Sequence, residues 1–99
     1  MVEINIFLDE DDIYEDMPMY EHIMRYLLHS QIKGATVLRG FEGFGSKRHL
    51  HTPRKFSAAD EDPLLILFID EEQKVDKVLP HIKKILDDVL ITKKIVEVI

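Results

Sequence analysis

Cysteine is absent from this 99-residue chain, and positive charge is scarce. Without cysteine the chain has no disulfide framework, no thiol nucleophile and no thiolate metal site, which suits a reducing compartment. Lysine and arginine together number 13, against 19 aspartates and glutamates, and the formal net charge is −6. This balance opposes general attraction to nucleic acid or to an anionic membrane, so binding to a polyanion requires a local basic patch.

Long apolar runs are also missing. The sequence contains no apolar stretch that approaches membrane-spanning length. Met1 leads directly into the alternating segment VEINIFL, which lacks the basic flank and the apolar core of a signal peptide. We therefore expect a cytoplasmic protein without direct membrane insertion, and the length indicates one domain over residues 1–99.

The spacing of apolar residues predicts a strand and then a helix in the first part of the chain. In VEINIFLD (2–9) apolar residues alternate with polar ones, as in a strand with one buried face. Apolar residues then recur at helical spacing over 17–32. Asp16 is the expected N-cap of this helix, and Gly34 is the expected stop.

Four further patterns follow. ATVLR (35–39) is rich in strand-forming residues, and LLILFI (64–69) is a continuous apolar run, typical of a central strand covered on both faces. A second helical pattern runs over 71–89 and contains Pro80, where we expect a kink or a weakened first half. TKKIVEVI (92–99) predicts a final strand whose last residues are anchored in the sheet.

The resulting order, β-α-β-β-α-β, predicts an α+β fold of the ferredoxin-like type. In that arrangement two helices pack on one face of a four-stranded antiparallel sheet. The other face of the sheet must be exposed to water or covered by a partner. It carries apolar residues, including Phe7. Self-association is the natural remedy for such a face.

The segment RGFEGFGSKR (39–48) is the strongest candidate for a binding site. Its glycines let the backbone approach a ligand, and its cations can neutralise phosphate. The candidate phosphate-binding residues are Arg39, Gly40, Gly43, Phe44, Gly45, Ser46, Lys47 and Arg48. The alternative is a solvated loop with ordinary turn glycines, and in either case we expect a long flexible loop over 46–62.

Other constellations give competing hypotheses. His49 and His51 lie two residues apart and could bind a divalent metal together with a carboxylate. RGFEGFG partly matches an RNA-recognition signature, but Glu42 interrupts it and the net charge argues against a nucleic-acid partner. The six acids from Asp9 to Asp16 are typical of a solvated turn before a helix. No nucleophile motif is present. An enzyme, such as a small phosphate-ester hydrolase that binds its substrate at the same segment 39–48, is therefore the weaker alternative.

The blocks DDIYEDMPMYEHI, GATVLRGFEGFG and LHT, with the ending VEVI, resemble a family of uncharacterised PII-like proteins over nearly the whole chain. The resemblance implies a ferredoxin-like fold and kinship with the PII signalling proteins, which are trimers. PII proteins bind adenine nucleotides in clefts between subunits. A long loop after their second strand meets the membrane transporters or enzymes that they regulate.

Carried over to this chain, residues 43–45 resemble the GFG at the base of that loop, and Lys47 and Arg48 occupy the basic positions beyond it. Ser46 stands where PII proteins have an arginine, and nothing between 86 and 94 resembles their second phosphate loop. Apart from these two departures, the resemblance implies a non-enzymatic, homotrimeric sensor of an adenine nucleotide. No other cofactor is required, and the expected partner class is a transport protein.

Overall fold

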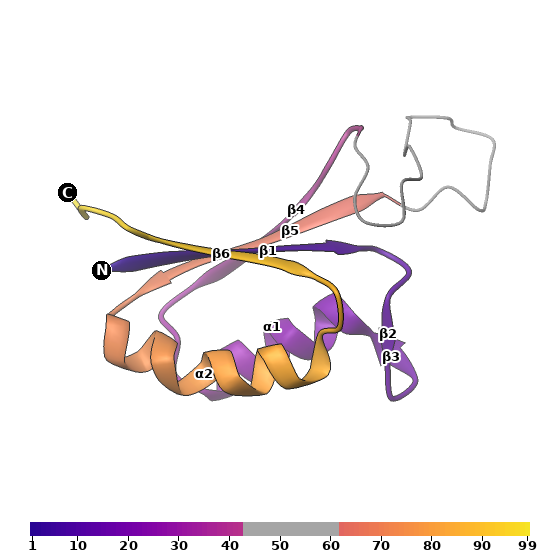
Figure 1. The fold of residues 1–99 in the computed structure, drawn as a ribbon, viewed down its shortest axis with the longest axis horizontal. Helices are drawn as coiled ribbons and strands as arrows, with labels where there is room; N and C mark the ends of the chain where they lie inside the picture. The colour runs from indigo at the N-terminus through magenta and orange to yellow at the C-terminus, as the bar shows by residue number, and fades with distance from the viewer. Residues whose placement is uncertain (43–61) are drawn as a thin grey trace.

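The computed structural model describes residues 1–42 and 62–99. Its main sheet is antiparallel throughout, in the spatial order β4-β5-β1-β6. The strands are β1 (Val2–Asp9), β4 (Ala35–Arg39), β5 (Pro63–Asp70) and β6 (Leu90–Ile95). Both helices, α1 (Met19–His29) and α2 (Glu72–Ile85), lie against the same face of this sheet (Figure 1). The predicted ferredoxin-like α+β fold is confirmed.

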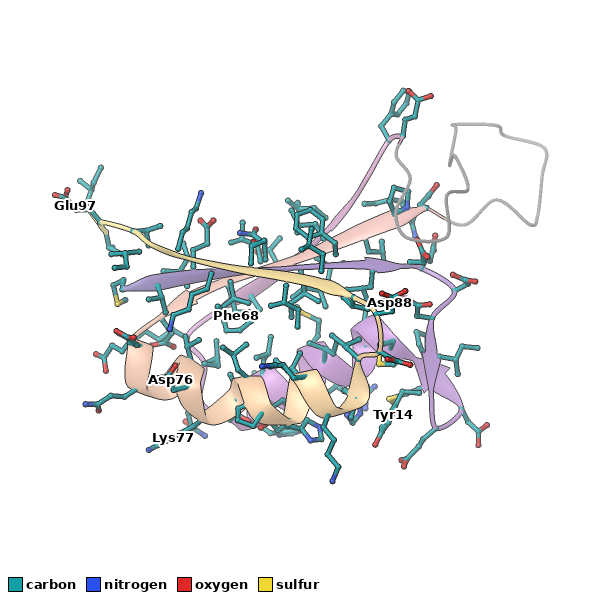
Figure 2. The ribbon with its side chains drawn as sticks, in the orientation of Figure 1. Tyr14, Phe68, Asp76, Lys77, Asp88 and Glu97 are labelled. Carbon is teal, nitrogen blue, oxygen red and sulfur yellow. The ribbon has the colours of Figure 1, made fainter. Side chains whose placement is uncertain are left out.

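The core lies between the sheet and the two helices. Alternate residues of β1 and β5 are buried, as the period-two pattern of β1 predicts. Figure 2 shows Phe68 pointing from β5 towards the helices, which meet the sheet with apolar stripes. The buried helix residues are Met19, Ile23, Leu27, Val75, Val78 and Ile82. On β5 the residues of the opposite face are half-buried, so that face is less covered than its apolar run suggested.

A short hairpin precedes α1 and was not predicted. It consists of β2 (Ile13–Tyr14) and β3 (Met17–Pro18), which pair across Glu15 and Asp16. Both turn residues have positive φ, 46° and 67°, which the two-residue turns of twisted hairpins favour. The prediction of Asp16 as a helix cap is therefore wrong, because α1 follows Pro18 and has no side-chain cap.

Both helices end earlier than their periodicity indicated. α1 ends at His29 instead of Ile32, and Gln31 takes the left-handed conformation, with φ 67°, that Gly34 was expected to supply. α2 runs through Pro80 and ends at Ile85. Among the residues that the structure describes, neither helix is long and apolar enough to cross a membrane.

The last strand begins and ends earlier than predicted. β6 spans Leu90–Ile95, and its pairing with β1 ends where Val2 lies opposite Ile95. A final hydrogen bond joins the Val96 N–H to the Met1 carbonyl over 3.0 Å. Beyond it β1 offers no further partner, so Val98 and Ile99 are exposed and the prediction that they are anchored in the sheet is wrong.

Candidate functional site

The chain leaves β4 and returns to β5 at one tightly closed point. The Gly40 N–H donates to the Pro63 carbonyl over 2.6 Å. A β-carbon on Gly40 would lie 2.7 Å from the Pro63 Cγ and 3.2 Å from the Pro63 carbonyl oxygen. Glycine is needed here for close approach, and its φ is not positive. Gly40, one of the predicted site residues, thus fixes the place where the candidate segment begins.

The Arg39 guanidinium forms ion pairs at the same place in the structure. The Arg39 Nη2 lies 2.5 Å from a carboxylate oxygen of Glu10, and its Nε lies 3.1 Å from one of Asp62. Glu10 and Asp62 are also joined through their backbones, by a 3.0 Å hydrogen bond from the Glu10 N–H to the Asp62 carbonyl. Arg39 was predicted to bind phosphate, and in this structure it joins the ends of three segments. Because its side chain is 61% exposed, a ligand anion could compete for it.

An apolar row crosses the face of the sheet opposite to α1 and α2 at this end (Figure 1). The strand register places Leu38 opposite Leu65, Leu65 opposite Phe7, and Phe7 opposite Leu90. Phe7, Leu38 and Leu90 are each between 45% and 61% exposed. We call these four residues the apolar row. The sequence indicated such a face through Phe7, but the alignment of one side chain from every strand depends on the register.

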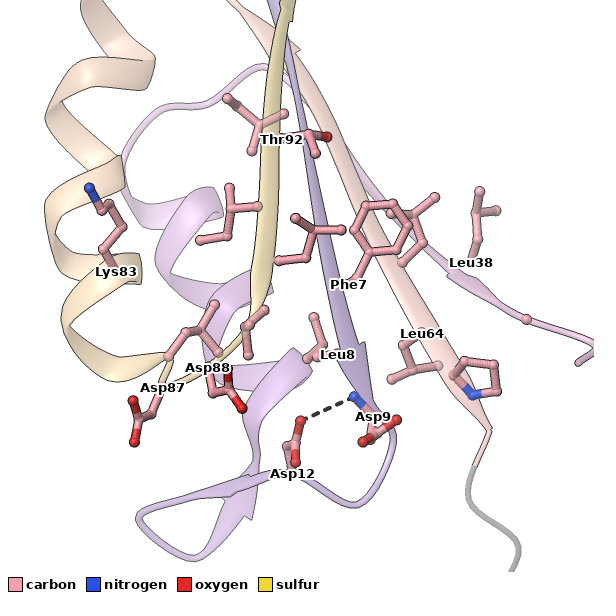
Figure 3. A pocket seen from close by; sticks show the side chains of 18 of the residues that line it. Phe7, Leu8, Asp9, Asp12, Leu38, Leu64, Lys83, Asp87, Asp88 and Thr92 are labelled. Atoms are coloured by element: carbon pink, nitrogen blue, oxygen red, sulfur yellow. Dashed lines mark hydrogen bonds between the residues drawn. The ribbon is translucent and has the colours of Figure 1, made fainter. Parts of the chain in front are cut away.

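The apolar row lines one part of a hollow of about 1180 Å³, whose lining includes residues from both faces of the sheet (Figure 3). All four strands, the last turns of α2 and the α2–β6 connection contribute to it (Figure 3). Figure 3 shows Phe7 and Leu38 on one side of the strands, with Lys83 and Asp87 near α2. Arg39 and Gly40 also line it, so the exit of the candidate segment opens directly into the hollow.

The charged groups around the hollow are mainly acidic among the described residues. The acids are Asp9, Asp12, Glu42, Asp87 and Asp88, against the cations Arg39, Lys83 and Lys93. The Lys93 ammonium group lies 3.4 Å from a carboxylate oxygen of Glu72 and 3.5 Å from one of Asp76, both on α2. The hydrogen bond to Glu72, together with Asp76, raises the pKa of Lys93 above its ordinary value, although desolvation lowers it. A phosphate in this hollow therefore needs additional positive charge.

Three carboxylates gather at the rim. One carboxylate oxygen from each of Asp9, Asp11 and Asp12 lies within 4.8 Å of the others. The Asp9 N–H donates to an Asp12 carboxylate oxygen over 3.1 Å, drawn as a dashed line in Figure 3. This backbone hydrogen bond holds the Asp12 carboxylate beside Asp9. Carboxylate oxygens are the ligands that Mg²⁺ and Ca²⁺ prefer, although exposed acids often group without an ion.

Most of the predicted site lies outside the described residues. This holds for the phosphate-binding candidates Gly43, Phe44, Gly45, Ser46, Lys47 and Arg48, for the metal candidates His49 and His51, and for the predicted loop over 46–62 except Asp62. The structure places Arg39 and Gly40 together at the hollow. The remaining roles stay predictions.

Known proteins share this sequence pattern and this architecture. The family model DUF190, described as "Uncharacterized ACR, COG1993", matches residues 1–98. A UPF0166 protein of Aquifex aeolicus (strain VF5) is 32% identical over 80 residues, which cover 81% of this chain and 76% of the relative. Another UPF0166 protein, from Methanocaldococcus jannaschii, is 34% identical over 83 residues, covering 84% and 76%.

A solved structure with a similar fold is that of CutA1 from Pyrococcus horikoshii, with a TM-score of 0.61 over 100% of this chain and 86% of that chain. Its sequence identity of 16% makes this a likeness of fold alone. The resemblance to an uncharacterised PII-like family is confirmed by the family match. With a match over residues 1–98 and two relatives above 30% identity, this chain belongs to the uncharacterised, PII-like DUF190 family.

Proposed function

We propose that this protein is a cytoplasmic, PII-like signalling protein. It forms a homotrimer, binds an adenine nucleotide in clefts between subunits, and regulates a partner such as a transport protein through the segment that follows β4. Family membership supports the PII-like character. The nucleotide, the trimer and the partner are inferred from the resemblance to PII proteins.

The observation that carries the proposal is the joining of three features at one end of the sheet. The glycine-rich and basic segment leaves β4 at Gly40, the hollow opens beside it, and the apolar row forms part of the hollow's wall. An adenine ring is flat and largely apolar on its faces, so the exposed row offers it a contact surface. The phosphates would then lie towards Arg39 and the segment beyond it.

Charge decides which residues must hold the phosphates. The described lining of the hollow is mainly acidic, and Arg39 is engaged by two carboxylates. Lys47 and Arg48 therefore supply most of the charge that neutralises the phosphates, and Mg²⁺ adds further positive charge. Nucleotide binding affects the partner by shifting the conformational population of the segment. Phosphate contacts made in only one conformation favour that conformation, and the partner recognises it.

The experiment is a calorimetric titration with ATP, ADP, AMP and cyclic nucleotides, with and without Mg²⁺, while the mass in solution is recorded. We expect saturable binding of one nucleotide per subunit. Replacing both Lys47→Glu and Arg48→Glu should weaken binding about 100-fold or more, because two charge-assisted contacts are lost and become repulsive. The mass of the assembly should stay unchanged.

A matched control carries the same change of net charge elsewhere. Lys77→Glu with Lys84→Glu alters two exposed lysines on α2, outside the lining of the hollow, and should keep the affinity. Equal affinity in the Lys47 and Arg48 variant would contradict the proposed phosphate role. Sustained nucleotide hydrolysis that disappears with that variant would identify the hydrolase alternative instead.

A further inference from the structure

Two histidines that lie far apart in the sequence meet between the helices. His22 of α1 and His81 of α2 bring their Nε2 atoms to 3.3 Å from each other. The two ring centroids lie 5.5 Å apart, which exceeds the Nε2 separation by nearly the sum of the two ring radii. The two nitrogens therefore face each other almost head-on. Both side chains are half-buried.

Their surroundings hold the two rings in place. The ring of Tyr14 lies 4.4 Å from that of His22, and the ring of Tyr26 lies 4.2 Å from that of His81, centroid to centroid. Figure 2 labels Tyr14, which belongs to the β2–β3 hairpin beside the helices. On the backbone, each histidine precedes a fully buried isoleucine. An aromatic ring therefore contacts each imidazole, and buried packing anchors each helix beside it.

Two facing Nε2 lone pairs repel each other unless a positive centre lies between them. A proton on one nitrogen provides the observed hydrogen bond, with one tautomer as donor and the other as acceptor. A metal ion satisfies both nitrogens at once. With metal–nitrogen bonds of about 2.05 Å and a tetrahedral angle, two imidazole nitrogens lie about 3.3 Å apart, and their ring centroids approach to about 5.2 Å. A modest tilt of the two rings is enough to reach this geometry.

We propose that His22 and His81 form a two-histidine site for a borderline transition-metal cation, of which Zn²⁺ is the probe. Imidazole is a good ligand for Zn²⁺, Cu²⁺ and Ni²⁺ and a poor one for Mg²⁺ and Ca²⁺. Water completes the coordination, since the two side chains are only half-buried. The bound ion links α1 to α2. This site shares no residue with the lining of the hollow, uses neither His49 nor His51, and does not depend on nucleotide binding.

The test measures thermal unfolding of the full chain with Zn²⁺, with Mg²⁺ and with a chelator. We expect Zn²⁺ to raise the Tm by several degrees, chelator to reverse the rise, and Mg²⁺ to have no such effect, because an ion that binds only the folded state stabilises it by mass action. His22→Gln and His81→Gln should each remove most of the rise. His29→Gln, on an exposed position of the same helix, should keep it.

A direct readout separates this site from the alternatives. In nitrogen-detected NMR of the histidine rings, Zn²⁺ should shift the Nε2 signals of His22 and His81 together, while His29 stays unchanged. This measurement uses the unaltered chain and so does not depend on a variant's folding. The proposal fails if these two signals do not move, if both glutamine variants keep the full Tm rise, or if a His49→Asn with His51→Asn variant alone abolishes it.

Discussion

Asp70 is a carboxylate with no exposed surface, at the last position of β5. It accepts hydrogen bonds from the backbone N–H groups of Lys33, over 2.9 Å, and Glu71, over 2.7 Å. Its other neighbour is the Lys74 ammonium at 3.6 Å. Asp70 thus ties the loop after α1 to the start of α2, and its cost of burial is offset by donors on two segments.

This environment makes Asp70 a source of acid sensitivity. Burial alone would raise the pKa of Asp70, but the two backbone donors, with Lys74 and Lys33, lower it below the ordinary value. A lowered pKa in the folded state stabilises the fold above the unfolded-state pKa, about 4. The contribution is lost as the pH falls through the lower pKa of the folded protein. Stability should therefore decline below about pH 4.

Asp70→Asn should lower the free energy of unfolding by about 1–3 kcal/mol at pH 7, because the Asn amide group cannot accept both hydrogen bonds. Urea unfolding at pH 7, 4 and 3 measures the effect, and the difference between the two proteins should shrink as the pH falls. Asp87→Asn, at an exposed position, serves as the control with little change. A difference that stays constant across this range would contradict the assignment.

At the scale of elements, the closure of β4 onto β5 depends on the absence of a side chain at Gly40. Gly40→Ala should lower the free energy of unfolding by about 1–2 kcal/mol, because the new methyl group would overlap Pro63. Urea or thermal unfolding measures this loss. Nucleotide affinity, measured on the same variant, should fall if the exit of the segment must keep its geometry.

Gly34→Ala is the matched control for this substitution. A β-carbon at Gly34 meets no atom within 4 Å, and its φ is not positive. The unfolded chain loses conformational freedom when glycine becomes alanine, so this variant should be neutral or more stable by up to about 1 kcal/mol. If both variants lose the same stability, the contact with Pro63 is not the cause.

The order of the main elements could be predicted from the sequence because a buried face imposes a period of two on a strand and 3.6 on a helix. The β2–β3 hairpin could not be, because it has only two residues per strand and lacks the Asn-Gly turn signal, and Glu15 and Asp16 occupy the turn. The extent of β6 was also hidden. Its apolar residues continue to Ile99, and only the register against β1 shows where pairing ends.

Less of the candidate site could be predicted than of the fold. Composition and spacing marked the segment after Arg39, but the pairing of Arg39 with Glu10 and Asp62 depends on residues 29 and 23 positions away that only the folded sheet brings together. His22 and His81 are separated by 59 positions. No motif or spacing in the sequence links these two histidines, and only the packing of α1 beside α2 brings them together.

At the scale of the whole molecule, the apolar row lies on the face of the sheet opposite to α1 and α2 (Figure 1). Phe7→Lys with Leu90→Lys should dissociate the proposed trimer into monomers, because two charges would be buried at each contact. Light scattering after size-exclusion chromatography measures the mass. The helical content should be unchanged, because neither side chain belongs to the core between the sheet and the helices.

Leu28→Lys provides the control, since Leu28 is 70% exposed on α1 and belongs to the other side of the molecule. Its mass should equal that of the unaltered protein. A row variant that keeps the full mass would show that the copies meet through another surface. An unaltered protein that is a monomer would contradict the proposed trimer itself.

The contact between Gly40 and Pro63 holds both ends of the connection from β4 to β5 in one place. The backbone leaves and re-enters the sheet at hydrogen-bonded neighbours, and the ion pairs of Arg39 tie the flanking segments together. The entropic cost of closing a flexible connection grows only with the logarithm of its length. The scaffold therefore tolerates connections of very different length and composition at this position, so new recognition sequences can arise there, by evolution or by grafting, while the sheet stays as it is.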